Sequence, residues 1–209
     1  MFFFLFLPFI SIFSVVLGEQ CLQSPFIVPP TEKLDVVETF NKSGVTDDYL
    51  PVPPSGNLEL ILSSKLIPLG GIISPTLTYN YSLPTYHYSG VKKGELYTVF
   101  MLDIDWPSRD NPRERSYING IVVNNPFDNI LGGDFVVPFT PAVPEVNSGY
   151  HRYVGLLYKQ NDVIDADSMD LLKLAKFKTR FSAVDFAATY NLGNPIAGNI
   201  FFSRYVTCS

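Results

Sequence analysis

The order of apolar and polar residues along the chain predicts a fold built mainly from strands. Leu58, Leu60 and Leu62 alternate with their neighbours at the period of a half-buried strand. Elsewhere, runs of β-branched, aromatic and large apolar residues predict strands that are buried on both faces. The expected strands cover residues 58–62, 77–81, 96–104, 117–124 and 153–158. Connections rich in Pro and Gly separate them, as in a chain of strands joined by turns.

Three short stretches follow a helical pattern instead. Thr31 is the expected N-cap of the first, and Ser182 with Asp185 forms a capping pair at the start of the third. The three expected helices cover residues 31–41, 168–176 and 182–190. Many strands with a few peripheral helices predict an all-β domain of the β-sandwich type.

The first 18 residues are the least polar part of the chain. Residues 2–17 carry no charge, and Val16 and Gly18 suit the small-residue rule for signal cleavage. We therefore expect residues 1–18 to be a signal peptide, residues 19–209 to form a single domain, and the protein to be secreted. An uncleaved membrane anchor is the alternative, although the apolar run is short for a bilayer span.

Secretion changes how the cysteines and two asparagines are interpreted. Cys21 and Cys208 lie near opposite ends of the mature chain, and an even count in an oxidising compartment suggests one disulfide. Two free or intermolecular thiols are the alternative. Asn41 and Asn80 each begin an Asn-x-Ser sequon and are the expected glycosylation sites.

Composition and charge exclude some classes of partner. The chain has 209 residues, of which 46% are hydrophobic, and a net charge of −5. This suits one domain with a sizeable core. No basic run occurs, which argues against binding to nucleic acids and against attraction to anionic lipid surfaces. Gly-rich phosphate loops of the Walker and dinucleotide types are also missing from the sequence.

One stretch combines a buried strand with polar chemistry. Residues 97–102 are β-branched, aromatic or long apolar residues, and Asp103 and Asp105 follow them. Residues two apart on a strand point the same way, so we expect both carboxylates to leave on one face of the sheet. Pro107 then ends the strand.

Three segments carry a resemblance to a known family. They are Asp103-Ile-Asp-Trp-Pro-Ser-Arg109, Gly149-Tyr-His-Arg-Tyr153 and Leu192-Gly-Asn-Pro-Ile-Ala-Gly198, in this order. The chain resembles the phosphatidylethanolamine-binding proteins over about residues 31–205. The resemblance implies Greek-key topology for the β-sandwich, no enzymatic activity and no cofactor. It also implies a cis bond at Trp106–Pro107, and a second is expected at Arg115–Ser116.

The resemblance also implies a ligand site. Asp103 and His151 would line a small pocket that accepts the phosphate of a phospholipid head group or another small anion. A carboxylate beside an imidazole favours the charged imidazolium, which then binds phosphate. The other residues expected to shape this pocket are Pro107, Tyr117, Pro144 and Tyr153.

One position departs from the family pattern. Where the family usually has a second pocket histidine, ungapped alignment places Asn119. Asn can donate a hydrogen bond to phosphate but carries no charge, so the pocket would lose one cationic contact. We expect Asp105, Arg109 and Arg152 to form a structural ion-pair network rather than to contact ligand.

The sequence gives little support for an enzymatic role of these residues. Asp103, His151 and Ser108 contain the residue types of a hydrolytic triad, but no nucleophile elbow surrounds Ser108. Asp103, Asp105 and His151 lack the spacing of common metal sites, so no metal is expected. The sequence thus predicts a non-enzymatic protein that binds small anions or phospholipid head groups. The alternative is a protein-interaction module such as a serine-type protease inhibitor.

Overall fold

Most of the fold lies in β-strands. The computed structural model of the protein describes residues 27–79, 83–126 and 130–206. The strands are β1 (Ile27–Val28), β2 (Gly56–Asn57), β3 (Glu59–Leu62), β4 (Lys65–Ile67), β5 (Gly71–Ile73), β6 (Thr85–His87), β7 (Leu96–Asp103), β8 (Tyr117–Asn125), β9 (Asp134–Val137), β10 (His151–Gln160) and β11 (Ala197–Ser203). The helices are α1 (Val36–Lys42), α2 (Val45–Asp48), α3 (Pro75–Tyr79), α4 (Met169–Lys176) and α5 (Ala183–Thr189), with a 3₁₀ turn at Ile130–Gly132.

The longest strands form the centre of a large sheet. Its strand order is β1-β5-β11-β10-β7-β8-β9, with β2 paired to β11. Strand β10 lies between β7 and β11 and is antiparallel to both. Its pairing with β7 places Tyr153 opposite Asp103, so the end of β7 meets the start of β10. A smaller sheet, β4-β3-β6, completes the strands of the described residues.

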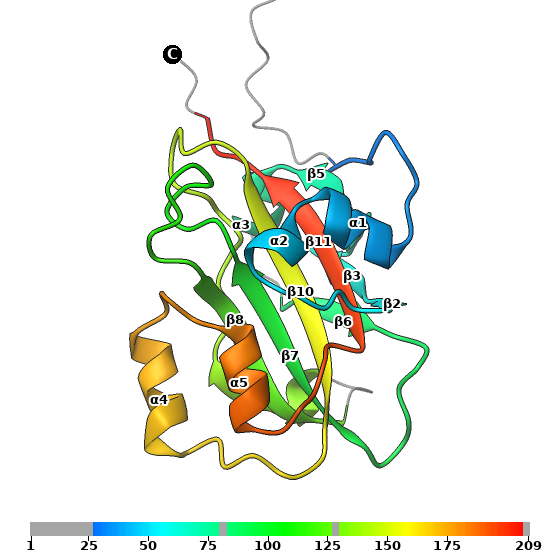
Figure 1. Cartoon of the computed structure of the whole chain (residues 1–209), viewed down its shortest axis with the longest axis vertical. Helices are drawn as coiled ribbons and strands as arrows, with labels where there is room; N and C mark the ends of the chain where they lie inside the picture. The colour runs from blue at the N-terminus through cyan, green and yellow to red at the C-terminus, as the bar shows by residue number, and fades with distance from the viewer. Residues whose placement is uncertain (1–26, 80–82, 127–129, 207–209) are drawn as a thin grey trace, which may run out of the picture.

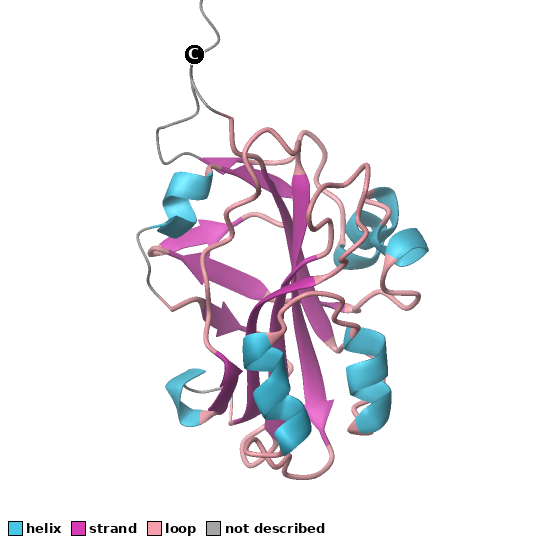
Figure 2. Cartoon of the chain, turned by 90° about the vertical axis from the view of Figure 1, so that its left-hand side faces the viewer, coloured by secondary structure: helices cyan, strands magenta, loops and turns pink. Residues whose placement is uncertain are grey.

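Two apolar cores lie on opposite faces of the large sheet. Helices α1, α2, α4 and α5 lie in front of this sheet in Figure 1, and Figure 2 shows the same layers from the side. The front core packs helix residues such as Phe40 and Phe186 against Phe100 and Val154. On the other face, the small sheet packs onto residues such as Tyr153.

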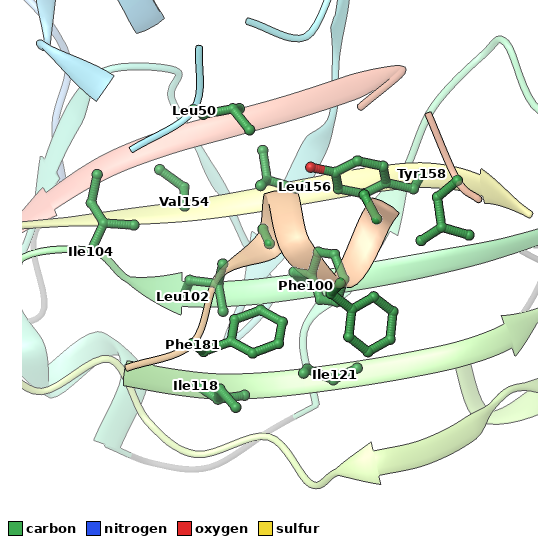
Figure 3. Packing of buried hydrophobic residues seen from close by; sticks show 14 of the residues in the cluster. Leu50, Phe100, Leu102, Ile104, Ile118, Ile121, Val154, Leu156, Tyr158 and Phe181 are labelled. Atoms are coloured by element: carbon green, nitrogen blue, oxygen red, sulfur yellow. The ribbon is translucent and has the colours of Figure 1, made fainter. Parts of the chain in front are cut away.

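Aromatic rings hold α5 against the sheet. The Phe100 ring on β7 meets Tyr158, Phe181 and Phe186 edge-on, with ring centroids 5.4, 5.5 and 5.1 Å apart. Figure 3 shows Phe100 and Phe181 beside the side chains that project from β10. Edge-to-face pairs add to the stabilisation from area burial, so this cluster fixes the position of α5.

Most of the predicted strands and helices are present, although seven of the eleven described strands, among them β11, were not predicted. The expected strands at 58–62, 96–104, 117–124 and 153–158 correspond to β3, β7, β8 and β10, and the helices at 168–176 and 182–190 to α4 and α5. The prediction of a strand at 77–81 was wrong, because α3 occupies residues 75–79. Pro75 suits the first turn of a helix, and this outweighs the strand preference of the residues that follow it.

The first helix also begins later than predicted. Its N-cap is Asp35, whose side chain accepts a hydrogen bond from the Glu38 amide at 2.8 Å, so Thr31 lies outside the helix. Asp caps helices at least as well as Thr, and Glu38 in the first turn favours this start. Ser182 caps α5 as predicted and accepts from the Asp185 amide at 3.1 Å.

A sheet-rich fold with a few short helices is confirmed, whereas the Greek-key connectivity stays a prediction. Residues 1–18, Cys21, Asn80 and Cys208 lie outside the described residues, so the signal peptide, the disulfide and one glycosylation site also stay predictions. Asn41, the other expected glycosylation site, is exposed on α1. Among the described helices, none is long and apolar enough to span a membrane.

Candidate functional site

The end of β7 and the start of β10 bring the two sequence motifs together. Asp103 is the last residue of β7 and His151 is the first of β10. Asp103 Oδ2 lies 2.7 Å from His151 Nδ1, and the two residues are 1% and 0% exposed. The second oxygen of Asp103 accepts a hydrogen bond from the Asp105 amide at 2.9 Å. A buried carboxylate therefore orients the imidazole through one ring nitrogen.

Ser148 occupies the other ring nitrogen, and sequence reasoning had missed it. Ser148 Oγ lies 2.8 Å from His151 Nε2 and donates its hydrogen to the Glu145 carbonyl at 2.6 Å. A hydroxyl has one hydrogen, so Oγ must accept from Nε2. This arrangement of partners suits an imidazolium, in which both ring nitrogens donate. We call Asp103, Ser148 and His151 the His151 site.

The turn before β10 places Ser148 over the imidazole. Asn147 and Gly149 both have positive φ, 60° and 87°. Asn and Gly tolerate this left-handed region better than other residues. The sequence Asn147-Ser-Gly149 was therefore a detectable turn signal. What it could not show was the direction of the Ser148 hydroxyl.

Asp105 lies on the other side of the sheet, and the prediction of one common face was wrong. Its carboxylate bonds to Arg152, which follows His151 on β10 and so points to the opposite face. Arg152 Nε and Nη2 reach the two carboxylate oxygens at 2.8 and 2.6 Å. Strand β7 ends at Asp103, so its alternation does not extend to Asp105.

Arg152 is fully buried and has further partners near α2. Its Nη2 also reaches Asp48 Oδ2 at 2.7 Å, and its Nη1 donates to the Ser43 carbonyl at 3.0 Å. Burial lowers the pKa of Arg152, but the hydrogen bonds and charges of Asp105 and Asp48 outweigh that effect and raise it. The guanidinium therefore joins β10 to the turn after β7 and to the α1–α2 connection.

Arg109, the third residue expected in the ion-pair network with Asp105 and Arg152, takes a different position. Arg109 is exposed and donates to the Ser43 carbonyl at 3.2 Å. Arg115, which sequence reasoning did not include, lies 3.3 Å from Asp105 Oδ1. The structure therefore brings Asp105 together with Arg152 and Arg115, and Arg109 reaches the group only through a shared carbonyl.

Asn119 bonds to the loop that follows β9. It lies at an irregularity of β8, where Met101 pairs with Gly120 and Leu102 with Ile118. Its amide nitrogen lies 3.1 Å from the Pro141 carbonyl. The amide oxygen is buried without a hydrogen-bond partner in the described part of the chain. No hydrogen bond among the described residues joins Asn119 to Asp103 or His151.

Aromatic residues surround the His151 site. The Trp106 and Tyr117 rings lie 5.0 Å apart, and Tyr117 pairs in register with Asp103. The Tyr153 ring stacks on that of His151 with centroids 6.4 Å apart. Burial and, second, the charge of Asp103 raise the pKa of the Tyr153 hydroxyl well above its ordinary value. Tyr153 is thus a neutral wall of the site.

The prolines take positions on the two loops. Pro107 follows a cis bond to Trp106 and is half-buried, and Pro144 is buried just ahead of the turn that carries Ser148. The cis bonds predicted at Trp106–Pro107 and Arg115–Ser116 are both confirmed.

The arrangement has the distances of a Ser-His-Asp triad but not its proton positions. In such a triad His Nε2 must be free to take the proton of the serine. Here Ser148 donates to the Glu145 carbonyl and Nε2 donates to Ser148, so the geometry does not activate the hydroxyl. Within the described residues, no group of three or more His, Cys, Asp or Glu side chains is arranged to hold a metal ion.

Four cavities open on the described part of the chain, and none of these four is lined by Asp103, Asn119 or His151. The imidazolium is closed off by the Ser148 turn. An incoming anion must therefore displace the serine hydroxyl to reach Nε2. The arrangement can hold one anionic oxygen at Nε2, in the place that Ser148 Oγ occupies.

Solved structures with similar folds include one inhibitor and one lipid-binding relative. A carboxypeptidase Y inhibitor in complex with its cognate proteinase matches with a TM-score of 0.66 and 20% identity, over 81% of this chain and 95% of that chain. A phosphatidylethanolamine-binding protein from Plasmodium vivax matches with a TM-score of 0.60 and 18% identity, over 85% and 98%. At these identities the likeness shows the fold alone.

Sequence comparison gives a more direct relationship. The chain is 29% identical over 167 residues to a 26 kDa secreted antigen of Toxocara canis, which covers 79% of this chain and 63% of that relative. This chain therefore spans less than two thirds of the length of that relative. The family model for phosphatidylethanolamine-binding protein matches residues 63–202, about two thirds of the chain, including the ends of β7 and β10 that carry Asp103 and His151. The chain belongs to the phosphatidylethanolamine-binding protein family.

Proposed function

We propose that the protein is a secreted, non-enzymatic binding protein whose His151 site takes the phosphate of a phospholipid head group or of a similar small molecule. The observation that carries this proposal is the Nε2–H of His151. It belongs to a buried, charged imidazolium and is satisfied by a serine hydroxyl on a surface turn. A phosphate oxygen accepts a stronger hydrogen bond from a charged donor than a hydroxyl does. The relative named as a secreted antigen supports secretion.

The neighbouring residues suit a head group with both a phosphate and an ammonium. Asp103 supplies negative charge beside the imidazolium, and the Trp106 and Tyr117 rings supply apolar walls. A ring face attracts an ammonium group. Asn119, two residues after Tyr117 on β8, has a buried oxygen without a partner among the described residues, and such an oxygen can accept a hydrogen bond from an ammonium.

Calorimetric titration with phosphorylethanolamine tests the proposal. We expect the unmodified protein to bind, and Ser148→Ala to bind roughly threefold to tenfold more tightly, because its Nε2–H has no internal acceptor to give up. His151→Gln should abolish binding, with its fold checked by circular dichroism. Ser55→Ala, the same change at an exposed position just before β2, is the matched control. Equal affinities in the unmodified protein and in Ser148→Ala would contradict the role given to Nε2.

A protease-binding module is the second candidate. One solved structure with this fold is a carboxypeptidase Y inhibitor bound to its proteinase. The family that the chain resembles also contains inhibitors. Inhibition would draw on a broad protein surface rather than on the His151 site. Assays against serine carboxypeptidases with the unmodified protein and His151→Gln distinguish the two candidates. Inhibition that survives in His151→Gln would favour the second.

A further inference from the structure

A second site lies on the other face of the large sheet. A groove of about 310 Å³ separates the segment after α2 from helix α5. Residues 50–52 form one wall, Ala187 and Ala188 of α5 form the other, and Tyr158 of β10 lies at the floor. Figure 3 shows Leu50 and Tyr158 among the side chains of the front core. We call this cavity the α5 groove.

The α5 groove is uncharged and mainly apolar, with Asn191 and Asn194 as the polar side chains besides Tyr158 in its lining. Its lining contains no Asp, Glu, Lys, Arg or His residue. The floor is deeply buried, since Leu50, Tyr158 and Ala187 are 2%, 1% and 5% exposed, whereas Val52 and Val184 at the rim are 42% and 39% exposed. A buried apolar floor with an open rim is the usual shape of a small-molecule site. The volume lies at the lower end of the range of roughly 300–1,000 Å³ for such sites.

The floor holds one polar group that lacks a partner. Among the described residues, no side chain or backbone group forms a hydrogen bond with the Tyr158 hydroxyl, and this oxygen is not fully enclosed but reaches the groove. Burial raises the pKa of this hydroxyl above its ordinary value, so the group is a neutral donor. A Tyr hydroxyl that faces a cavity usually has a hydrogen-bond partner, either water or another polar atom. An oxygen atom of a ligand in the groove would provide it.

We propose that the α5 groove binds a small, uncharged, mainly apolar molecule with one hydrogen-bond-accepting oxygen, such as a ketone, aldehyde or ester. The apolar walls take the hydrocarbon part, and Tyr158 donates to the oxygen. The absence of charged lining residues disfavours phosphates and carboxylates, which need a charged partner when buried.

The α5 groove is separate from the His151 site. Residues 151 and 158 are seven positions apart on β10, a separation of roughly 23 Å along an extended strand. Their side chains also lie on opposite faces, because His151 and Tyr158 differ by an odd number of residues. The proposal for the α5 groove can therefore be tested independently of the proposed head-group site.

Titration with camphor, a compact ketone, tests the proposal by NMR shifts of the full chain. We expect binding at the α5 groove, seen as shifts in residues 50–52 and α5. Ala188→Phe should fill the groove and weaken binding at least tenfold. Ala175→Phe, the same change at an exposed position on α4 outside the groove, should leave it unchanged.

Tyr158→Phe tests the hydrogen bond. It should weaken camphor binding roughly threefold to tenfold but should not weaken binding of bornane, the hydrocarbon with the same frame and no oxygen. Saturating phosphorylethanolamine should displace neither ligand. The proposal is overturned if camphor does not bind, if Ala188→Phe binds it as well as the unmodified protein, or if Tyr158→Phe leaves its affinity unchanged.

Discussion

At the scale of single residues, the neighbours of His151 decide which chemistry the site can perform. Asp103 orients the ring, and Ser148 accepts from its outer nitrogen. With the protons in these positions, the imidazolium serves as a donor to an anion rather than as a base for a nucleophile. Asn119, where the family resemblance leads us to expect a histidine, carries no charge and donates to the Pro141 carbonyl.

Restoring the charge at this position should strengthen the proposed phosphate binding. We expect Asn119→His to bind phosphorylethanolamine up to roughly tenfold more tightly, because a hydrogen bond from a charged donor is worth about 1 kcal/mol more than a neutral one. The gain should be larger at about pH 6 than at about pH 8, since an imidazole near its usual pKa is charged only at the lower value. Calorimetry at both values measures it, and an unchanged affinity would place Asn119 away from the ligand.

At the scale of elements, buried polar contacts hold loops from distant parts of the sequence together. The Tyr49 hydroxyl, just after α2, lies 3.1 Å from Ser116 Oγ and 3.3 Å from the Phe181 carbonyl, and it accepts from the Ala183 amide at 3.1 Å. Tyr49 thus connects α2, the start of β8 and the start of α5. The same helix packs on the Phe100 ring, so its position depends on both apolar and polar contacts.

Removing the Tyr49 hydroxyl should loosen this connection. We expect Tyr49→Phe to lower the free energy of unfolding by about 1–3 kcal/mol, because the buried Ala183 amide loses its acceptor. Denaturant unfolding at neutral pH measures this loss. Tyr190→Phe, at the half-buried end of α5, is the control and should change little.

The same hydroxyl predicts an alkaline transition. Burial raises the pKa of Tyr49 to about 12, against about 10 for a free tyrosine. A raised pKa in the folded state contributes stability that is fully present below about pH 10 and is lost as the pH rises through about 12. The unmodified protein should therefore lose more stability across this window than Tyr49→Phe does. Parallel losses in both proteins would contradict the assignment.

At the scale of the whole molecule, Arg152 links the two strand ends to the helical layer. It is fully buried, and Asp105 and Asp48 share its charge. A buried charge with two carboxylate partners constrains the geometry around it, because loss of either partner leaves the charge less well compensated. The network thus lies on the helix-covered face of the large sheet, opposite the face that carries the His151 site.

Acid should weaken this network through Asp48. Burial opposes ionisation of Asp48, but the hydrogen bond and charge of Arg152 outweigh it, so the pKa of Asp48 is lowered. A lowered pKa in the folded state contributes stability above the unfolded value of about 4 that is lost as the pH falls further. Asp48→Asn should cost up to about 1 kcal/mol at neutral pH, a modest figure because the side chain is 42% exposed.

The pH dependence separates this effect from a packing defect. The difference between Asp48→Asn and the unmodified protein should shrink as the pH falls below about 4, and thermal unfolding at several pH values measures it. Asp47→Asn, an exposed neighbour, is the matched control. A difference that stays constant across this range would point to packing rather than charge.

The two cysteines predict a further constraint on the whole chain. If Cys21 and Cys208 pair in the secreted protein, closing so long a loop should stabilise it by up to about 5 kcal/mol in the chain-entropy model. Peptide mapping without reduction should find one fragment joining the two cysteines, and reduction should lower the unfolding temperature. Two separate thiol-bearing peptides in the secreted material would contradict the pairing.

Long strands could be predicted from the sequence, whereas other elements and most side-chain contacts could not. Strands β7, β8 and β10 could be predicted because their apolar runs are long and their local preferences agree with burial. Residues 77–81 could not, because their side chains favour a strand while Pro75 favours a helix start. The motifs ending β7 and starting β10 indicated that Asp103 and His151 belong together, and the register of the two strands brings them within 2.7 Å.

Sequence by itself determined the sheet-rich class, four of the eleven strands in the described residues, two of the helices and the family. These depend on local periodicity and on motifs whose residues are neighbours in the chain. Only the tertiary structure decided that Asp103 and Asp105 serve opposite faces, that Ser148 closes over His151, and that Tyr158 lines a groove beside α5. The physical reason is that each of these contacts joins side chains from separate elements, and its direction depends on where a strand ends and how a turn is oriented.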